Sequence, residues 1–300
     1  MDNTHQLLII SGPTATGKTA LAAKLAKKFN GELISADSRQ IYQSLDIGTG
    51  KDHPRGVKLH LIDLIPPNLS FSVAQYRQFA LSKIKDIHSR NKLPIIVGGT
   101  GQYLDSIINP RETFSIPPNH LLRFFLNRLP VSLLQKLYFL LDKNSFLKLN
   151  NSDRYNPHRL IRKIEIKLSN PKVKNPKPAI TSYLHLSLTA SNSYLYPRID
   201  ARVEKRLKIG LLDEIKKLLS LYKWSDPGLN TLAYQEFRPY FQKHSPIEES
   251  IQKWRFHEHA YARRQKTWFK KQKNIIFVDI SQSKFDQKVT TLVSKWYNQS

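Results

Sequence analysis

Short apolar runs alternate with amphipathic stretches over the first hundred residues. Each run is bounded by glycine, proline or polar residues, which is typical of buried strands. Strands that alternate with helical patterns form a parallel sheet with helices on both faces. The pattern therefore predicts an α/β fold built on such a sheet. The predicted strands are "LLIIS" at 7–11, "ELISA" at 32–36, "LHLIDLI" at 59–65 and "LPIIVGG" at 93–99.

A different pattern follows. Residues 117–148 place apolar side chains at helical spacing without any strand signal, as in "VSLLQKLYFLL". Strand character returns at 182–188 and 274–280, so segments after this helical stretch would complete the sheet. We therefore expect the first part of the core at 1–112, a helical insertion at 113–155, and at 156–300 the rest of the core with basic C-terminal helices.

Three further segments can be predicted. Residues 196–222 have the spacing of one long amphipathic helix, and residues 246–272 predict another, rich in Arg, Lys and aromatic residues. The proline-rich stretch 169–178 predicts a loop.

The charge balance indicates a polyanionic partner. The chain has 48 Lys and Arg against 23 Asp and Glu, a formal net charge of +25. Such an excess favours nucleic acid, although a generally basic surface would explain it as well. The absence of cysteine excludes disulfides, thiolate zinc sites and a cysteine nucleophile. No apolar run has membrane-spanning length, and residues 1–6 lack the form of a secretory signal. We expect a cytoplasmic protein without a membrane partner.

The segment "GPTATGKT" matches the phosphate-binding pattern G-x-x-x-x-G-K-[ST] and lies between a predicted strand and a predicted helix. Glycines at both ends let the backbone turn tightly around an anion, and the helix adds its positive end. Lys18 supplies a charge for phosphate oxygens, and Thr19 can ligate Mg²⁺. The alternative is a glycine turn without function. The predicted phosphate site comprises Gly12, Pro13, Thr14, Ala15, Thr16, Gly17, Lys18 and Thr19.

Two more segments follow predicted strands and should lie beside this loop, since strand carboxyl ends line the ligand crevice of an open α/β sheet. "DSRQ" supplies Asp37, a candidate base or indirect Mg²⁺ ligand, with a turn or capping aspartate as the alternative. It also supplies Ser38, Arg39 and Gln40, and glutamine can pair with adenine. "GGTGQY" supplies Thr100, unless it is only a glycine turn.

With these segments the chain resembles the tRNA dimethylallyltransferases, also called tRNA isopentenyltransferases. The resemblance covers nearly the whole chain. It is carried by "GPTATGKT", "DSRQIYQSLDIGTGK", "HLIDLIPP", "FSVAQYRQFA", "LPIIVGGTGQYL", "NPHRLIRKIEI", "LYPRIDARVEKRLKIGLLDEI" and "HAYARRQKTWFKK", in this order.

The resemblance implies a P-loop NTPase-like fold and transfer of the dimethylallyl group from dimethylallyl diphosphate to N6 of adenine 37, in tRNAs that read codons beginning with U. The loop would then hold a prenyl diphosphate with Mg²⁺ on Thr19, Asp37 would accept the amine proton, and Thr100 would bind nearby. A monomer would act on the anticodon stem-loop. The expected tRNA contacts are Asp37, Ser38, Arg39, Gln40, Thr100, Arg123, His158, Arg159, Leu160, Ile161, Arg162, Arg263 and Arg264.

Some positions depart from the pattern, and other functions stay open at this point. Many relatives have glycine where this chain has Ala233, and some have arginine where Asn230 aligns. His257 and His259 are two apart and lack the i, i+4 spacing of a zinc helix. The alternatives are a small-molecule P-loop kinase, a non-enzymatic RNA-binding module, and an adenylate isopentenyltransferase, which would not need the insertion or the basic C-terminal helix.

Overall fold

The computed structural model describes residues 6–109, 111–169 and 179–299. Two compact units divide the chain: an α/β unit, Met1–Ile108 with Pro178–Ser300, and a helical unit, Asn109–Lys177. The proline-rich loop predicted at 169–178 lies, after Ser169, outside the described residues. In the described part of the chain, no helix has both the length and the apolar character that crossing a bilayer requires.

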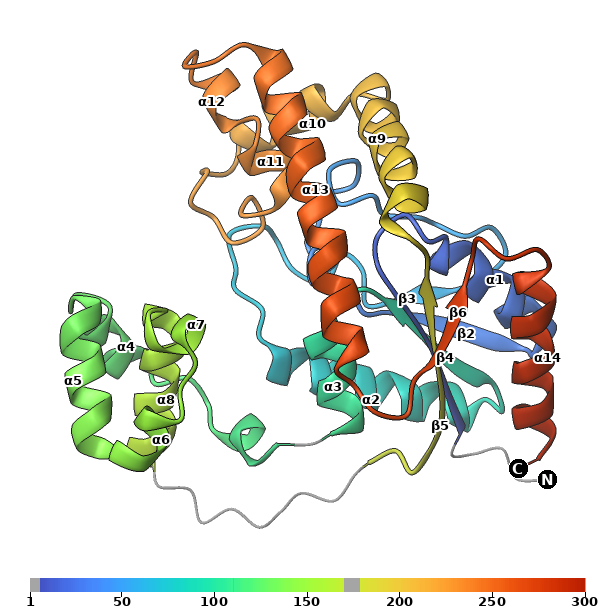
Figure 1. Cartoon of the computed structure of the whole chain (residues 1–300), viewed down its shortest axis with the longest axis horizontal. Helices are drawn as coiled ribbons and strands as arrows, with labels where there is room; N and C mark the ends of the chain where they lie inside the picture. The colour runs from blue at the N-terminus through green and yellow to red at the C-terminus, as the bar shows by residue number, and fades with distance from the viewer. Residues whose placement is uncertain (1–5, 110, 170–178, 300) are drawn as a thin grey trace. The chain divides into compact units, whose positions relative to one another are not determined.

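The core of the α/β unit is a parallel sheet with the strand order β3-β2-β4-β1-β5-β6 (Figure 1). The central strand β1 pairs with β4 on one side and β5 on the other. The chain therefore leaves β1 toward one edge of the sheet and later completes the other edge, which is the arrangement that places a ligand crevice at strand carboxyl ends. The strands are β1 Gln6–Ser11, β2 Gly31–Ser35, β3 Leu59–His60, β4 Leu93–Gly98, β5 Ser182–Thr189 and β6 Ile276–Asp279.

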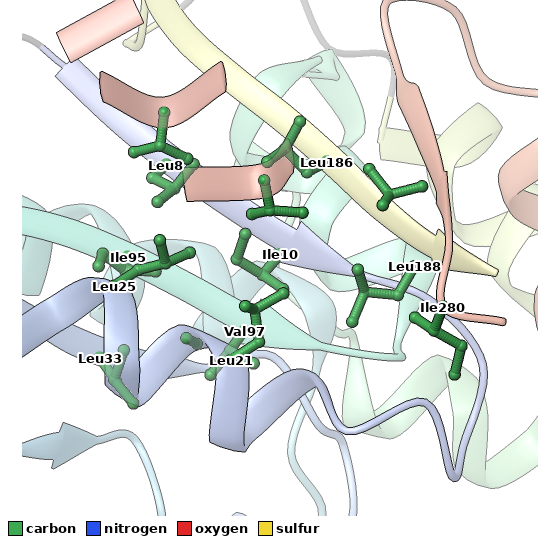
Figure 2. Packing of buried hydrophobic residues seen from close by; sticks show 14 of the residues in the cluster. Leu8, Ile10, Leu21, Leu25, Leu33, Ile95, Val97, Leu186, Leu188 and Ile280 are labelled. Atoms are coloured by element: carbon green, nitrogen blue, oxygen red, sulfur yellow. The ribbon is translucent and has the colours of Figure 1, made fainter. Parts of the chain in front are cut away.

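Helices cover both faces of the sheet, as predicted. Successive side chains of β1 point to opposite faces: Leu8 and Ile10 belong to the core that α1 and α14 complete, and Leu7 and Ile9 to the core of α2 and α3. Figure 2 shows the first core, with Leu8 and Ile10 next to side chains of β4 and β5. These helices are α1 Lys18–Lys28, α2 Val73–Ser89, α3 Gly101–Ile108 and α14 Phe285–Asn298.

A third apolar core includes residues that follow β2 in the sequence, and it was not predicted. It joins Tyr42 and Leu45 to side chains such as Val203, Ile215 and Trp254, which come from the remaining helices of this unit. The core anchors α9 and α13, the two long helices that contribute to the candidate site. The helices are α9 Asn192–Lys208, α10 Leu211–Leu219, α11 Leu232–Gln235, α12 Arg238–Phe241 and α13 Ile247–Lys270.

Two predicted elements differ from the structure. The strand predicted at 59–65 ends after His60, because Leu61 and Asp63 adopt left-handed backbone angles (φ 61° and 54°) that no strand continues through. The single helix predicted at 196–222 is two helices, α9 and α10, separated at Gly210, whose φ of 102° stops a right-handed helix. The helix predicted at 246–272 is confirmed as α13.

The helical unit has its own apolar core. Leu160, Ile161 and Ile164 on α8 pack with Leu134 and Tyr138 of α5. Because this stripe places α8 in the helical unit, the unit extends past the predicted boundary at residue 155. Its elements are the 3₁₀ turn Glu112–Ser115, α4 His120–Leu126, α5 Val131–Leu141, α6 Lys143–Leu147, α7 Asn151–Arg154 and α8 Pro157–Ser169.

Candidate active site

The loop after β1 has the backbone of an anion-binding turn. Gly12, Ala15 and Gly17 have positive φ angles of 137°, 64° and 79°. At Gly12 a Cβ atom would lie 2.3 Å from the carbonyl oxygen of Leu188, so only glycine fits there. The helix α1 begins at Lys18, directly after this turn. Its free amide groups and positive end therefore face the loop, as the sequence predicts.

Lys18 lies near one arginine and two carboxylates. Its Nζ donates to the Pro13 carbonyl at 2.7 Å. Desolvation and, next in size, the charge of Arg202 lower the pKa of Lys18 to about 7, although the carboxylates of Asp37 and Asp52 oppose this shift. An anion held between Lys18 and Arg202 would relieve the repulsion and favour the charged lysine.

The segment after β2 is tied to the segment after β4. The Ser38 amide donates to Thr100 Oγ1 at 3.0 Å, and the Thr100 amide donates to the Ala36 carbonyl at 3.1 Å. Asp37 Oδ1 accepts from the Arg39 amide at 2.9 Å. Thr100 therefore holds the backbone on both sides of Asp37, the candidate base.

Gln40 is engaged within the protein at both ends of its side-chain amide. Its Oε1 accepts from Ser35 Oγ at 3.1 Å, and its Nε2 donates to the Gly50 carbonyl at 3.2 Å. In this arrangement Gln40 braces residue 50 against β2.

A cavity of about 490 Å³ joins the predicted segments. Its lining includes ten of the predicted residues. Outside the lining are Gly12, Pro13, Thr16 and Thr100, of which the last three form hydrogen bonds within or between the loops. Arg263 is also outside the lining and donates to the Tyr196 hydroxyl at 2.6 Å. The ten lining residues are Thr14, Ala15, Gly17, Lys18, Thr19, Asp37, Ser38, Arg39, Gln40 and Arg264.

A row of arginines on α9 was not predicted. Arg198 Nε donates to the Ala15 carbonyl at 3.0 Å, and Arg202 Nη1 donates to Thr14 Oγ1 at 3.1 Å. Arg206 reaches the Gly48 carbonyl at 3.3 Å, and burial followed by the charge of Arg202 lowers its pKa to about 10. The spacing of four residues, visible in "RIDARVEKR", places all three on one face of the helix. This regularity is the signal that could have revealed them.

The helix α13 joins the two glycine loops. Gln265 Oε1 accepts from the Thr14 amide at 2.9 Å, and its Nε2 donates to the Gly99 carbonyl at 3.0 Å. One turn earlier Tyr261 lines the cavity, and burial raises the pKa of its phenol. One side chain of a helix that is distant in sequence thus sets the separation between the phosphate loop and the end of β4.

Comparison with known proteins identifies the family. The family model described as "IPP transferase" matches residues 40–272. A tRNA dimethylallyltransferase of Roseiflexus sp. (strain RS-1) is 38% identical, over 97% of this chain and 98% of its own. The crystal structure of the tRNA isopentenylpyrophosphate transferase from Bacillus halodurans is similar with a TM-score of 0.75 and 32% identity, covering 98% of this chain and 97% of its own. The chain belongs to the IPP transferase family.

A eukaryotic structure extends the similarity. This structure, of a eukaryotic dimethylallyltransferase acting on tRNA, is similar with a TM-score of 0.81 and 25% identity over 96% of this chain and 78% of its own. The chain is therefore a prenyl-group transferase, and its P-loop-like fold is that of the family.

Within this IPP transferase, the helical unit carries several of the expected tRNA contacts. His158 and Arg159 are exposed, and Arg159 pairs with Asp153 at 2.6 Å. Leu160 and Ile161 are 0% and 3% exposed and pack in the core of the unit, so their side chains are not available to RNA. We withdraw these two as tRNA contacts.

Arg123 and Arg162 share one buried carboxylate. Arg123 Nη2 donates to Glu165 Oε2 at 2.7 Å, and Arg162 pairs with the same oxygen. Arg162 also donates to the carbonyls of Thr113 and Ile116, each at 2.9 Å. Both guanidinium groups are partly exposed but fixed in position, which suits a preformed contact with phosphate.

The histidines of α13 have partners other than a metal. His257 Nδ1 lies 2.7 Å from Glu236, and His259 Nε2 lies 2.8 Å from Asp200. Over residues 6–109, 111–169 and 179–299, no group of three or more His, Cys, Asp or Glu side chains is arranged to hold a metal.

Proposed function

We propose that this IPP transferase moves the dimethylallyl group of dimethylallyl diphosphate to N6 of adenine 37, in tRNAs reading codons that begin with U. The observation that carries the proposal is that Lys18 of the phosphate loop and Asp37 line one cavity. One cavity can therefore hold the diphosphate that leaves the reacting carbon and the base that accepts the proton of the attacking amine.

The diphosphate end of the donor fits the positive side of the cavity. Lys18, Arg202 and Arg206 all line it, next to the N-terminus of α1. As the carbon–oxygen bond breaks, negative charge grows on the leaving diphosphate, and fixed positive groups stabilise it. Asn230, which also lines the cavity, carries no charge, so we expect the positive charge at the diphosphate to come from Lys18, Arg202 and Arg206.

The acceptor end is served by Asp37. A new carbon–nitrogen bond forms at N6 while diphosphate departs, and the amine proton passes to the Asp37 carboxylate. The adenine amine is a weak nucleophile, so a positioned base contributes substantially. Adenine 37 must leave its stack to reach the cavity.

The cavity also has the oxygen donors that Mg²⁺ prefers. The Thr19 hydroxyl and the Asp52 carboxylate both line it, and Mg²⁺ commonly combines one or two protein oxygens with phosphate oxygens and water. Thr19, with Asp52, would hold the ion. When bound, Mg²⁺ offsets charge on the diphosphate.

The charge of the helical unit supports an RNA substrate. Residues 111–169 contain 11 Lys or Arg and 4 Asp or Glu. These side chains suit the phosphates of an anticodon stem-loop, and phosphate contacts position RNA without selecting its sequence. In the α/β unit, Arg263 and Arg264 of α13 have the same charge and are exposed.

The test is to incubate the protein with tRNA and labelled dimethylallyl diphosphate and to map the labelled nucleotide after nuclease digestion. We expect label at adenine 37 and none in a tRNA with guanine at that position. Label elsewhere, or phosphorylation by ATP without prenyl transfer, would refute the proposal.

A further inference from the structure

One carboxylate, outside the cavity lining, organises a wall of the active site. Glu214, in the first turn of α10, accepts from three consecutive backbone amides: Asp46 at 2.9 Å, Ile47 at 2.7 Å and Gly48 at 2.9 Å. The Tyr234 hydroxyl donates to the same carboxylate at 2.8 Å. Four donors therefore converge on one side chain.

The segment held by Glu214 continues directly into the cavity. Gly48, Thr49, Gly50 and Asp52 line it, as residues of the phosphate loop also do. The Gly48 carbonyl accepts from Arg206, which lines the cavity as well. The position of residues 46–52 thus determines where this backbone and Arg206 would contact a bound prenyl diphosphate.

The packing around this segment leaves little freedom. A Cβ atom at Gly48 would lie 2.4 Å from the Tyr234 ring, and one at Gly50 would lie 1.9 Å from Arg206 Nη2. Tyr234 is fully buried in the third core. The backbone of residues 48–50 is therefore fitted between a fixed aromatic ring and an arginine.

We propose that Glu214 is a positioning residue of the active site, which acts through residues 46–50 on the binding of the prenyl diphosphate. A carboxylate offers acceptors on both oxygens, whereas an amide in its place offers one and presents a donor to the backbone N–H groups. Glu214→Gln would leave backbone amides of residues 46–48 without a hydrogen-bond partner. This favours movement of residues 46–50 away from the bound prenyl diphosphate. The identity of the donor rests on the proposed function.

The kinetic test compares Glu214→Gln with Glu32→Gln at saturating tRNA. Glu32 is the matched control: it is a buried carboxylate that binds Arg90, His60 and Lys92 but does not line this cavity. We expect kcat/KM for dimethylallyl diphosphate to fall about 10- to 100-fold in Glu214→Gln, the scale of a misplaced substrate, and less than about twofold in Glu32→Gln. Equal losses in both variants would overturn the proposal, since they would reflect stability alone.

Hydrogen exchange tests the positioning without any substrate. Peptides covering residues 42–52 should exchange faster in Glu214→Gln, and peptides of β1 and β4 should not change. Unchanged exchange over residues 42–52 would overturn the proposal. If Glu214→Gln does not fold, Tyr234→Phe removes one donor and keeps the three amide bonds, and a smaller increase in exchange over the same peptides is expected. A wild-type protein without prenyl transfer would refute the proposed function but leave this test valid.

Discussion

The surroundings of Lys18 in the folded protein change its protonation. Its pKa of about 7 means that the folded protein binds fewer protons than the unfolded chain between pH 7 and the ordinary lysine value of 10.5. The unfolding free energy contributed by this site therefore rises with pH over that interval. Below pH 7 Lys18 is charged in both the folded and the unfolded state, and the desolvation of its ammonium group lowers the unfolding free energy by the largest amount.

Replacing Lys18 by methionine should remove this cost. We expect Lys18→Met to increase the unfolding free energy most near about pH 6, and the increase to shrink toward about pH 10. Urea unfolding at several pH values measures it. Lys24→Met, at an exposed position on the same helix, should show no such slope. A gain in Lys18→Met that is equal at all pH values would contradict the assigned pKa.

Asp37 should affect the chemical step more than binding. We expect Asp37→Asn to bind tRNA and dimethylallyl diphosphate normally and to lose about 10²- to 10⁴-fold in single-turnover rate, the usual contribution of a general base. Asp86→Asn, on the exposed face of α2, serves as the control. A comparable loss of tRNA affinity in Asp37→Asn would instead make Asp37 a binding residue.

At the scale of elements, one face of α9 supplies positive charge to the cavity. Arg202 lies on the face that lines the cavity, and Lys205 lies on the exposed face. We expect Arg202→Ala to raise KM for dimethylallyl diphosphate by about tenfold or more, because one charged hydrogen bond to the donor is lost. Lys205→Ala should leave KM unchanged. Steady-state kinetics with saturating tRNA decide the matter, and equal KM values for both variants would exclude Arg202 from the donor site.

The helix α13 shows how far element prediction reaches. Its length followed from helical spacing at 246–272, and the structure has it at Ile247–Lys270. Its role as a clamp did not follow, because Gln265 contacts Thr14 and Gly99, which are distant in sequence. Periodicity shows which face of a helix is apolar, but not which loops a polar side chain on that helix will meet.

At the scale of the whole molecule, the net charge of +25 favours RNA, and we expect the basic surface of α13 to govern the binding. We expect tRNA affinity to fall steeply with salt, by about 0.7 to 0.9 in log K per log salt for each phosphate neutralised. Reversing Arg263 and Arg264 to Glu should flatten this slope, whereas the rate at bound adenine should change less, since phosphate contacts position the RNA. The comparison is made by filter binding across a salt series.

The matched control reverses Lys27 and Lys28, which are exposed at the end of α1 away from the phosphate loop. This variant changes the net charge by the same amount, so it should shift affinity only weakly. If both double variants had the same salt slope, general charge rather than the α13 surface would account for binding.

The sequence by itself determined the parallel sheet, the helical layers on its two faces, the phosphate loop and the position of Asp37 after β2. These features depend on local spacing and on short contiguous motifs. It could not determine that α8 belongs to the helical unit, since that depends on which partner its apolar stripe meets. It also could not show that Arg202, Arg206 and Gln265 line the cavity, or that Glu214 binds the amides of residues 46–48, because long-range packing brings these side chains to loops that are more than a hundred residues away in sequence. Local patterns specify elements, whereas only the tertiary structure decides which side chains from separate elements converge on one cavity.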